Sequence, residues 1–118
     1  MLYTNLKHIE SAAEHAQIIN ANEKVVIVCG SMGPMCVPVY RIAEELEAEY
    51  TSVKFYDMEL ENPESDVIRA LPEVQCFRNI PYIIWYKNGR VVQATSGLQT
   101  KAQMATIMDK EFAVPFNA

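Results

Sequence analysis

Two patterns of hydrophobic residues alternate along the chain, one typical of strands and one typical of helices, and they predict strands that alternate with helices. Runs of consecutive β-branched and aromatic residues are typical of strands buried on both faces. Apolar residues three and four positions apart, with acidic residues between them, indicate helices that cover a sheet. The strands expected from these runs are residues 2–5 at an edge, 24–29, 53–58, 82–87 and 90–94.

Capping residues and prolines mark the helices. Ser11 and Glu14 have the spacing of a capping box, so a helix is expected to run to about Asn20. Pro63 suits the first turn of a short helix that ends near Leu71. The other two helices are expected over residues 39–50 and 100–112, the second of which stops before Pro115.

The order of these elements indicates the fold class. The first part of the chain alternates strands and helices, which implies parallel pairing, whereas Asn88 and Gly89 predict a tight hairpin between the last two strands. We therefore expect an α/β fold with a mixed central sheet and helices on both of its faces. The 118 residues contain no repeat, linker or low-complexity segment, so residues 1–118 are expected to form one domain.

Charge and composition exclude several classes of function. A net charge of −5 argues against nucleic acid as a partner, because phosphate binding needs a basic face. No apolar run is long enough to span a membrane and the first residues lack a signal-peptide pattern, so we expect a cytoplasmic protein. Three cysteines are too few for a disulfide scaffold, and their odd number leaves a free thiol in a monomer. The oligomeric state stays open.

Residues 79–92 provide the strongest resemblance to a known family. They read Asn-Ile-Pro-Tyr-Ile-Ile-Trp-Tyr-Lys-Asn-Gly-Arg-Val-Val, which resembles the Ile-Pro-Thr run, the strand and the Lys-Asn-Gly hairpin of thioredoxins. Residues 57–63 are similar to that family's strand end and Asn-Pro helix start. The resemblance covers roughly residues 23–112 and implies a thioredoxin fold. It also implies a cis peptide bond before Pro81 and matches Gly97 to the glycine before the last helix.

The segment that carries the active site in thioredoxins departs from their Trp-Cys-Gly-Pro-Cys motif. Residues 29–36 read Cys-Gly-Ser-Met-Gly-Pro-Met-Cys. If Gly33 and Pro34 match the Gly-Pro of the motif, Met32 and Met35 replace both cysteines. A methionine thioether forms neither a thiolate nor a disulfide, so this alignment leaves no dithiol.

A second alignment follows the helix spacing backward from Tyr50. It makes Leu46 an inward position, adds one residue to the loop and places Cys36 at the second, buried cysteine of the motif. The sequence leaves both alignments open. Both lack the exposed first cysteine, which the resemblance makes the nucleophile, and both put Val26 where the family has a buried aspartate. The ordinary dithiol cycle therefore has no starting residue.

Each cysteine has a functional and a structural interpretation. Cys36 lies in or near the first turn of a helix, where the helix dipole stabilises a thiolate, yet free cysteines usually pack as small apolar side chains. A bridge between Cys29 and Cys36 requires Cα atoms about 4.4–6.8 Å apart. Cys76 is by default a free thiol on a loop beside the active-site face, with a regulatory or intermolecular disulfide as the alternative.

The methionines are open to two interpretations as well. Met32 and Met35 either fill the space of two thiols or form a soft contact surface for a partner. No ligand spacing supports a soft-metal site of these methionines with Cys36, and no phosphate loop, catalytic triad or EF-hand is present, so neither a metal nor a cofactor is expected. His8 and His15 are expected on the surface.

Two functions compete on these observations. The first is a thioredoxin-like protein that has lost its dithiol and binds a protein or peptide partner beside the cis-proline loop. The candidate binding residues are Met32, Gly33, Pro34, Met35, Ile80, Pro81 and Gly97. The second is an enzyme, an atypical thiol-disulfide oxidoreductase that uses Cys36 with Cys29, Cys76 or a partner's thiol. A structural or assembly role is a third option, and the distances between thiols decide between the first two.

Overall fold

A five-stranded mixed sheet forms the centre of the computed structural model, which describes residues 2–112. The strands lie in the order β1-β3-β2-β4-β5, with β1, β3 and β2 parallel to one another and β4 and β5 antiparallel to their neighbours. Their bounds are Lys7–Ile9 (β1), Lys24–Gly30 (β2), Lys54–Glu59 (β3), Tyr82–Lys87 (β4) and Arg90–Ser96 (β5). The expected α/β fold with a mixed sheet is confirmed.

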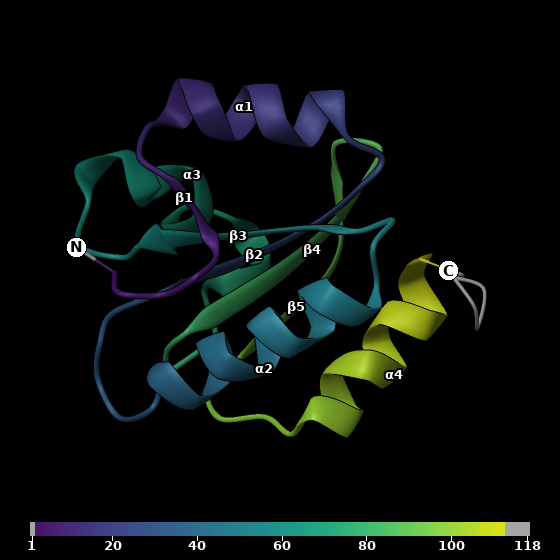
Figure 1. Cartoon of the computed structure of the whole chain (residues 1–118). Coiled ribbons are helices and arrows are strands. Elements are labelled where there is room, and N and C mark those ends of the chain that lie inside the picture. The colour runs from purple at the N-terminus through teal and green to yellow at the C-terminus, as the bar shows by residue number, and fades with distance from the viewer. Residues whose placement is uncertain (1, 113–118) are drawn as a thin grey trace.

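Helices cover both faces of this sheet (Figure 1). Helices α1 (Ala12–Ala21) and α3 (Asp66–Arg69) lie on one face, and α2 (Val37–Glu49) and α4 (Lys101–Phe112) lie on the other. Two short 3₁₀ turns, η1 (Pro63–Ser65) and η2 (Pro72–Val74), connect the middle of the chain. Among residues 2–112, none of the helices is long and apolar enough to cross a membrane.

The N-terminal segment differs from the expected edge strand over residues 2–5. The strand β1 begins only at Lys7. The residues before it form hydrogen bonds with side chains instead of with the backbone of a neighbouring strand. The Thr4 hydroxyl donates to Asp57 Oδ2 at 2.5 Å, and the Asn5 N–H donates to Glu44 Oε2 at 2.7 Å. These two bonds bring the start of the chain onto the side of the sheet that α2 covers.

The helix signals are largely confirmed. Ser11 is the N-cap of α1, and its hydroxyl accepts the N–H of Glu14 at 3.1 Å. The short helix after Pro63 starts as the 3₁₀ turn η1 and continues as α3, which ends at Arg69. Pro115, expected beyond the last helix, lies outside the described residues.

The hairpin forms at the expected place. Asn88 and Gly89 both have positive φ, at 53° and 80°, which suits the two central residues of a primed turn. The turn pairs Lys87 with Arg90 and places β5 at the edge of the sheet.

Side chains of β2 alternate between two separate core clusters. Val26 and Val28 face the cluster under α2 and α4, whereas Val25, Ile27 and Cys29 face the cluster under α1 and α3. The sheet backbone therefore separates the side chain of Cys29 from everything packed around α2.

Candidate functional site

Three segments converge where β2 ends and α2 begins. Gly30 is the last residue of β2, and a Cβ atom placed on it would lie 2.8 Å from Cys36 Sγ, 2.9 Å from Tyr40 Oη and 2.9 Å from Pro81 Cβ. A real side chain at position 30 would need one of these groups to move. The close approach brings the 31–36 loop, the first turn of α2 and the cis-proline loop (residues 79–81) together at one point.

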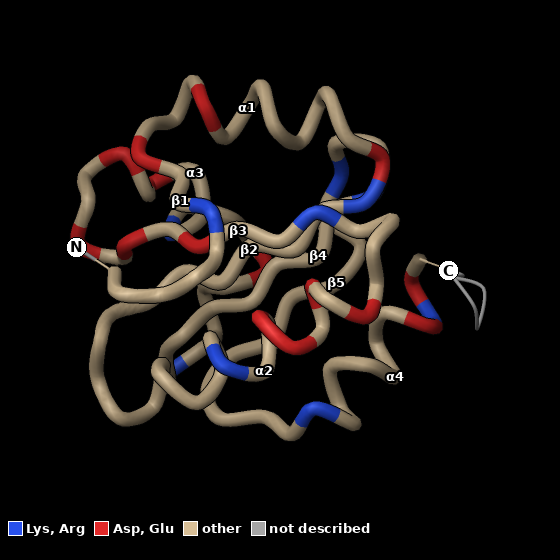
Figure 2. Tube along the Cα trace, in the orientation of Figure 1, with Lys and Arg blue, Asp and Glu red and all other residues tan. Residues whose placement is uncertain are grey.

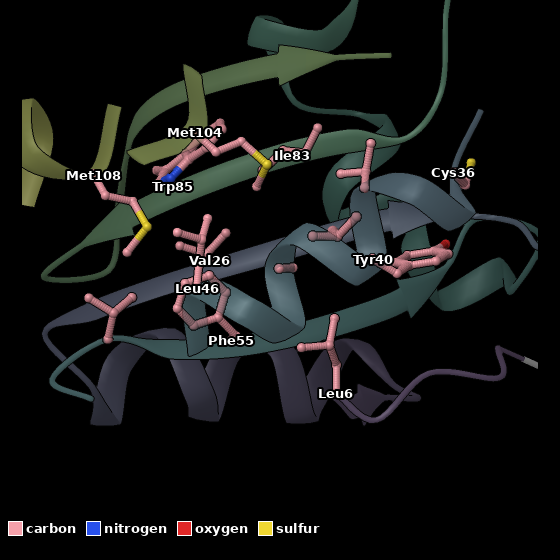
Figure 3. Packing of buried hydrophobic residues seen from close by; sticks show 14 of the residues in the cluster. Leu6, Val26, Cys36, Tyr40, Leu46, Phe55, Ile83, Trp85, Met104 and Met108 are labelled. Atoms are coloured by element: carbon pink, nitrogen blue, oxygen red, sulfur yellow. The ribbon is translucent and has the colours of Figure 1, made fainter. Parts of the chain in front are cut away.

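Cys36 is the N-cap residue of α2 and is fully buried. The Gly33 carbonyl accepts the N–H groups of both Cys36 and Val37 at 3.1 Å, which closes the turn that leads into the helix. The Cys36 sulfur accepts the Ser31 N–H at 3.4 Å and lies 3.8 Å from the Ser31 hydroxyl. Figure 3 shows Cys36 at the end of the core cluster that continues along α2 to Leu46.

The burial of Cys36 favours the alignment that places it at the buried second cysteine of the thioredoxin motif. Leu46 is also fully buried while Glu45 is exposed, as that alignment requires. In this alignment Gly33, three positions before Cys36, stands where the motif has its first cysteine.

The 31–36 loop presents thioethers and a proline to solvent. Pro34 is exposed, and Met32, Gly33 and Met35 are half-buried. Met32 packs against the cluster under α2, and its sulfur accepts the N–H of Tyr3 at 3.3 Å. This contact ties the loop to the N-terminal segment.

The cis-proline loop forms the second wall of the site. The Ile80–Pro81 peptide bond is cis, and the Pro81 carbonyl accepts the N–H of Gly97 at 3.0 Å. Gly97 has φ +80°, and a Cβ there would meet the Asn79 side chain at 3.2 Å. No hydrogen bond within residues 2–112 uses the backbone of Ile80. The structure thus brings Ile80, Pro81 and Gly97 together, with the Ile80 backbone left for a ligand.

The structure does not pair Cys29 with Cys36. Both are free thiols, and they belong to core clusters on opposite faces of the sheet, because alternate residues of a strand point to opposite sides. Burial raises the pKa of Cys29 to about 12, with Arg69 opposing the rise. Cys29 is therefore a protonated packing residue at neutral pH. Cys76 is the exposed free thiol.

Tyr40 is a site residue that the sequence analysis did not identify. It lies on the first turn of α2, it is fully buried, and its hydroxyl has no hydrogen-bond partner among residues 2–112. Burial, with the neighbouring Cys36 and Asp57, raises the pKa of Tyr40, so its phenol keeps its proton and is a donor. The spacing of apolar residues on α2 did not reveal it, because position 40 reads as an ordinary core position.

Asp57 was also missed as a buried acid on the face of the sheet that α2 covers. It pairs in register with Val28, and its carboxylate contacts the Thr4 hydroxyl and, at 2.6 Å, Nδ1 of His8. Burial raises the pKa of Asp57, and the bonds from Thr4 and His8 oppose the rise. Val26 lacks the carboxyl that the family has on β2, and this chain instead buries one on β3. An aspartate within an apolar strand run is the signal that could have revealed it.

The expectation that both histidines lie on the surface is only half correct. His8 is exposed, and its side chain pairs with Asp57 beside a pocket of about 340 Å³. His15 is buried, with its Nε2 2.9 Å from the Tyr86 hydroxyl. Helical spacing alone could not show this, because the partner of His15 lies on a distant strand.

The two loops of the candidate site contain no charged residue. Residues 29–36 and 79–81 include no Asp, Glu, Lys or Arg, whereas acidic residues follow α2 and the segments around β1 and α3 (Figure 2). Among the described residues, no group of three or more His, Cys, Asp or Glu side chains is arranged to hold a metal ion. The site can offer thioethers, backbone groups and one covered thiol to a ligand.

Solved structures of thioredoxins resemble this fold over most of the chain. A Plasmodium falciparum thioredoxin is 25% identical, with 89% of this chain and 98% of that chain covered and a TM-score of 0.69. Mitochondrial thioredoxin 3 from Saccharomyces cerevisiae is 20% identical over 88% and 94% of the two chains, with a TM-score of 0.71. Thioredoxin from Trypanosoma brucei brucei is 15% identical over 95% of each chain, with a TM-score of 0.76. No family model and no curated protein sequence matches the chain. The chain has the thioredoxin fold.

Proposed function

We propose that this chain, which has the thioredoxin fold, is a redox-degenerate thioredoxin-like protein that binds a protein or peptide partner in thiol and redox homeostasis. It acts as a single domain in the cytoplasm, and its partner lies in an extended conformation against the cis-proline loop. The thioredoxins among its structural neighbours support a redox-related setting.

One observation carries the proposal: the surface at the head of α2 exposes methionine and proline side chains and no thiol. Pro34 is exposed, Met32, Met35 and Ile80 are half-buried, and the only cysteine of the loop is fully covered. Methionine adapts its shape to apolar partners, and an uncharged surface loses little solvation when a peptide covers it. The Ile80 backbone supplies one N–H and one C=O for an extended chain.

A second candidate function is an atypical thiol-disulfide oxidoreductase in which Cys36 acts with Cys76 or with a partner's thiol. The observation in its favour is the position of Cys36 at the N-terminus of a helix of 13 residues, with the Ser31 N–H pointing at its sulfur. Helix N-termini and backbone donors favour a thiolate. The full burial of Cys36 opposes the attack of its sulfur on a protein disulfide.

Two measurements test the proposal. Insulin reduction with dithiothreitol is expected to proceed at the uncatalysed rate, and a rate like that of an ordinary thioredoxin would replace the binding proposal with the enzyme. Affinity capture with quantitative mass spectrometry tests binding. Proteins retained by the natural chain are expected to be lost with Ile80→Arg and kept with Ala102→Arg, a matched change on the exposed side of α4. Equal retention by both variants would contradict a site at Ile80.

A further inference from the structure

The Cys36 sulfur and the Tyr40 hydroxyl both lie beside Gly30. A Cβ atom on Gly30 would touch both, at 2.8 and 2.9 Å. Figure 3 shows the Tyr40 hydroxyl at the end of the cluster where Cys36 lies. Tyr40 is fully buried, and its O–H finds no acceptor among the described residues. A buried hydroxyl without a partner is uncommon, because it has lost its bonds to water without replacement.

The other groups at the sulfur are also hydrogen-bond donors. The Ser31 N–H points at Cys36 Sγ at 3.4 Å. The Ser31 oxygen accepts the N–H of Gly33 at 3.2 Å, so its own proton is left to point at the sulfur, 3.8 Å away. The N-terminus of α2 adds the positive end of a helix dipole. The groups around the sulfur are therefore donors, which an oxygen atom attached to the sulfur could accept from.

We propose that Cys36 is a hydroperoxide-reactive thiol whose sulfenic acid is held by the hydroxyl of Tyr40. The sulfur attacks one oxygen of the peroxide, an S–O bond forms and the O–O bond breaks. The sulfur is oxidised by two electrons, and the leaving oxygen takes the thiol proton, so hydrogen peroxide yields Cys36–SOH and water. The new oxygen accepts the Tyr40 O–H, which has no acceptor within residues 2–112 while the thiol is reduced.

Size and position restrict the reaction to small oxidants. Cys36 is fully covered, but Ser31, which contacts its sulfur, is itself partly exposed, so the sulfur lies directly below the surface. A protein disulfide cannot reach it without opening the loop, whereas hydrogen peroxide is about the size of two water molecules. The proposed partner binding needs no thiol chemistry, so this inference does not depend on it.

The experiment uses the full chain with Cys76→Ser, which removes the exposed thiol. The folded protein is treated with hydrogen peroxide, the oxidant is removed, and samples are unfolded in dimedone so that mass spectrometry locates the sulfenic acid. We expect the dimedone adduct on Cys36 and none on Cys29. An unmodified Cys36, at a peroxide dose that oxidises Cys76 in the natural chain, would overturn the proposal.

Tyr40→Phe tests the role of the hydroxyl. The lifetime of the sulfenic acid in added mercaptoethanol is expected to fall about two- to ten-fold, the size of one lost neutral hydrogen bond. Tyr56→Phe, which removes a hydroxyl from the opposite core cluster, is the matched control and should leave the lifetime unchanged. If Tyr40→Phe does not fold, Ser31→Ala, which removes the other hydroxyl donor, is expected to shorten the lifetime in the same way. An unchanged lifetime in the folded variant overturns the assignment.

Discussion

His15 on α1 and Tyr86 on β4 are joined by a hydrogen bond of 2.9 Å, although 71 positions separate them in the sequence. Their rings meet edge to face, with centroids 5.4 Å apart. Both residues are buried, so the contact fixes α1 to the sheet by a polar bond within a mainly apolar layer.

Stability is expected to depend on pH through His15. Burial lowers the pKa of His15 from its ordinary value of 6.5. Below 6.5 the unfolded chain therefore binds a proton that the folded chain resists, and the free energy of unfolding falls as the pH drops, by at most about 1.4 kcal/mol per pH unit. Urea unfolding at a series of pH values measures this slope.

Variants of the pair separate this effect from other titrations. His15→Gln removes the titrating group, so its unfolding free energy should fall less below pH 6.5 than that of the natural chain. Tyr86→Phe leaves the His15 nitrogen without its partner and should cost about 1 kcal/mol at neutral pH. Identical slopes for His15→Gln and the natural chain would contradict the prediction.

The sequence predicts those features that depend on neighbours along the chain. The Tyr82–Lys87 strand, the Asn88 and Gly89 turn and the Ser11 cap are local patterns, and all three are present. The thioredoxin fold follows from them in combination with the motif around Pro81.

The polar contacts of the core could not be predicted in the same way. Asp57 is buried because Thr4 and His8, about fifty positions earlier, bond its carboxylate. Tyr40 reads as an ordinary apolar position of a helix until Gly30 and Cys36 are placed beside its hydroxyl. Such contacts depend on tertiary packing, which periodicity does not encode.

Gly30 is expected to tolerate no side chain. In Gly30→Ala the new methyl group meets the Cys36 sulfur, the Tyr40 hydroxyl and the Pro81 ring below 3.0 Å, and overpacking of this kind costs about 1–3 kcal/mol. Thermal or urea unfolding measures the loss. Gly33→Ala is the control, because its methyl group meets only Ser31 Oγ, at 3.3 Å. Equal effects of the two changes would show that the close approach at Gly30 does not constrain the fold.

The three thiols are expected to differ in their reaction with iodoacetamide. Cys76 is exposed and should react first. Cys36 and Cys29 are fully buried, and each should react at least about 100-fold more slowly than Cys76, because each opening of the structure that exposes them costs a few kcal/mol. In Cys29 the raised pKa of about 12 adds to this protection. Mass spectrometry of each site, with unfolded protein as the reference, gives the rates, and fast native labelling of Cys36 would contradict its burial.

Gly33→Cys is expected to supply the missing partner of Cys36. The change creates two cysteines separated by Pro34 and Met35, and among the described residues the new Cβ atom comes close only to the Ser31 hydroxyl. We expect a disulfide between positions 33 and 36 and insulin reduction above the rate of the natural chain. Gly33→Ser is the control for the shape of the loop, and Gly33→Cys combined with Cys36→Ser should be inactive. If Gly33→Cys forms no disulfide between positions 33 and 36, the alignment in which Met35 replaces the buried cysteine would be favoured.

The open surroundings of position 33 also have a genetic consequence. The glycine codons GGT and GGC become the cysteine codons TGT and TGC when their first base is exchanged, so from either codon a Cys-Pro-Met-Cys sequence is one point mutation away. The contacts that hold Gly30 against Pro81 and Tyr40 need no change for that step. A single thiol and a closely spaced pair of thiols are therefore adjacent in mutational distance on this scaffold.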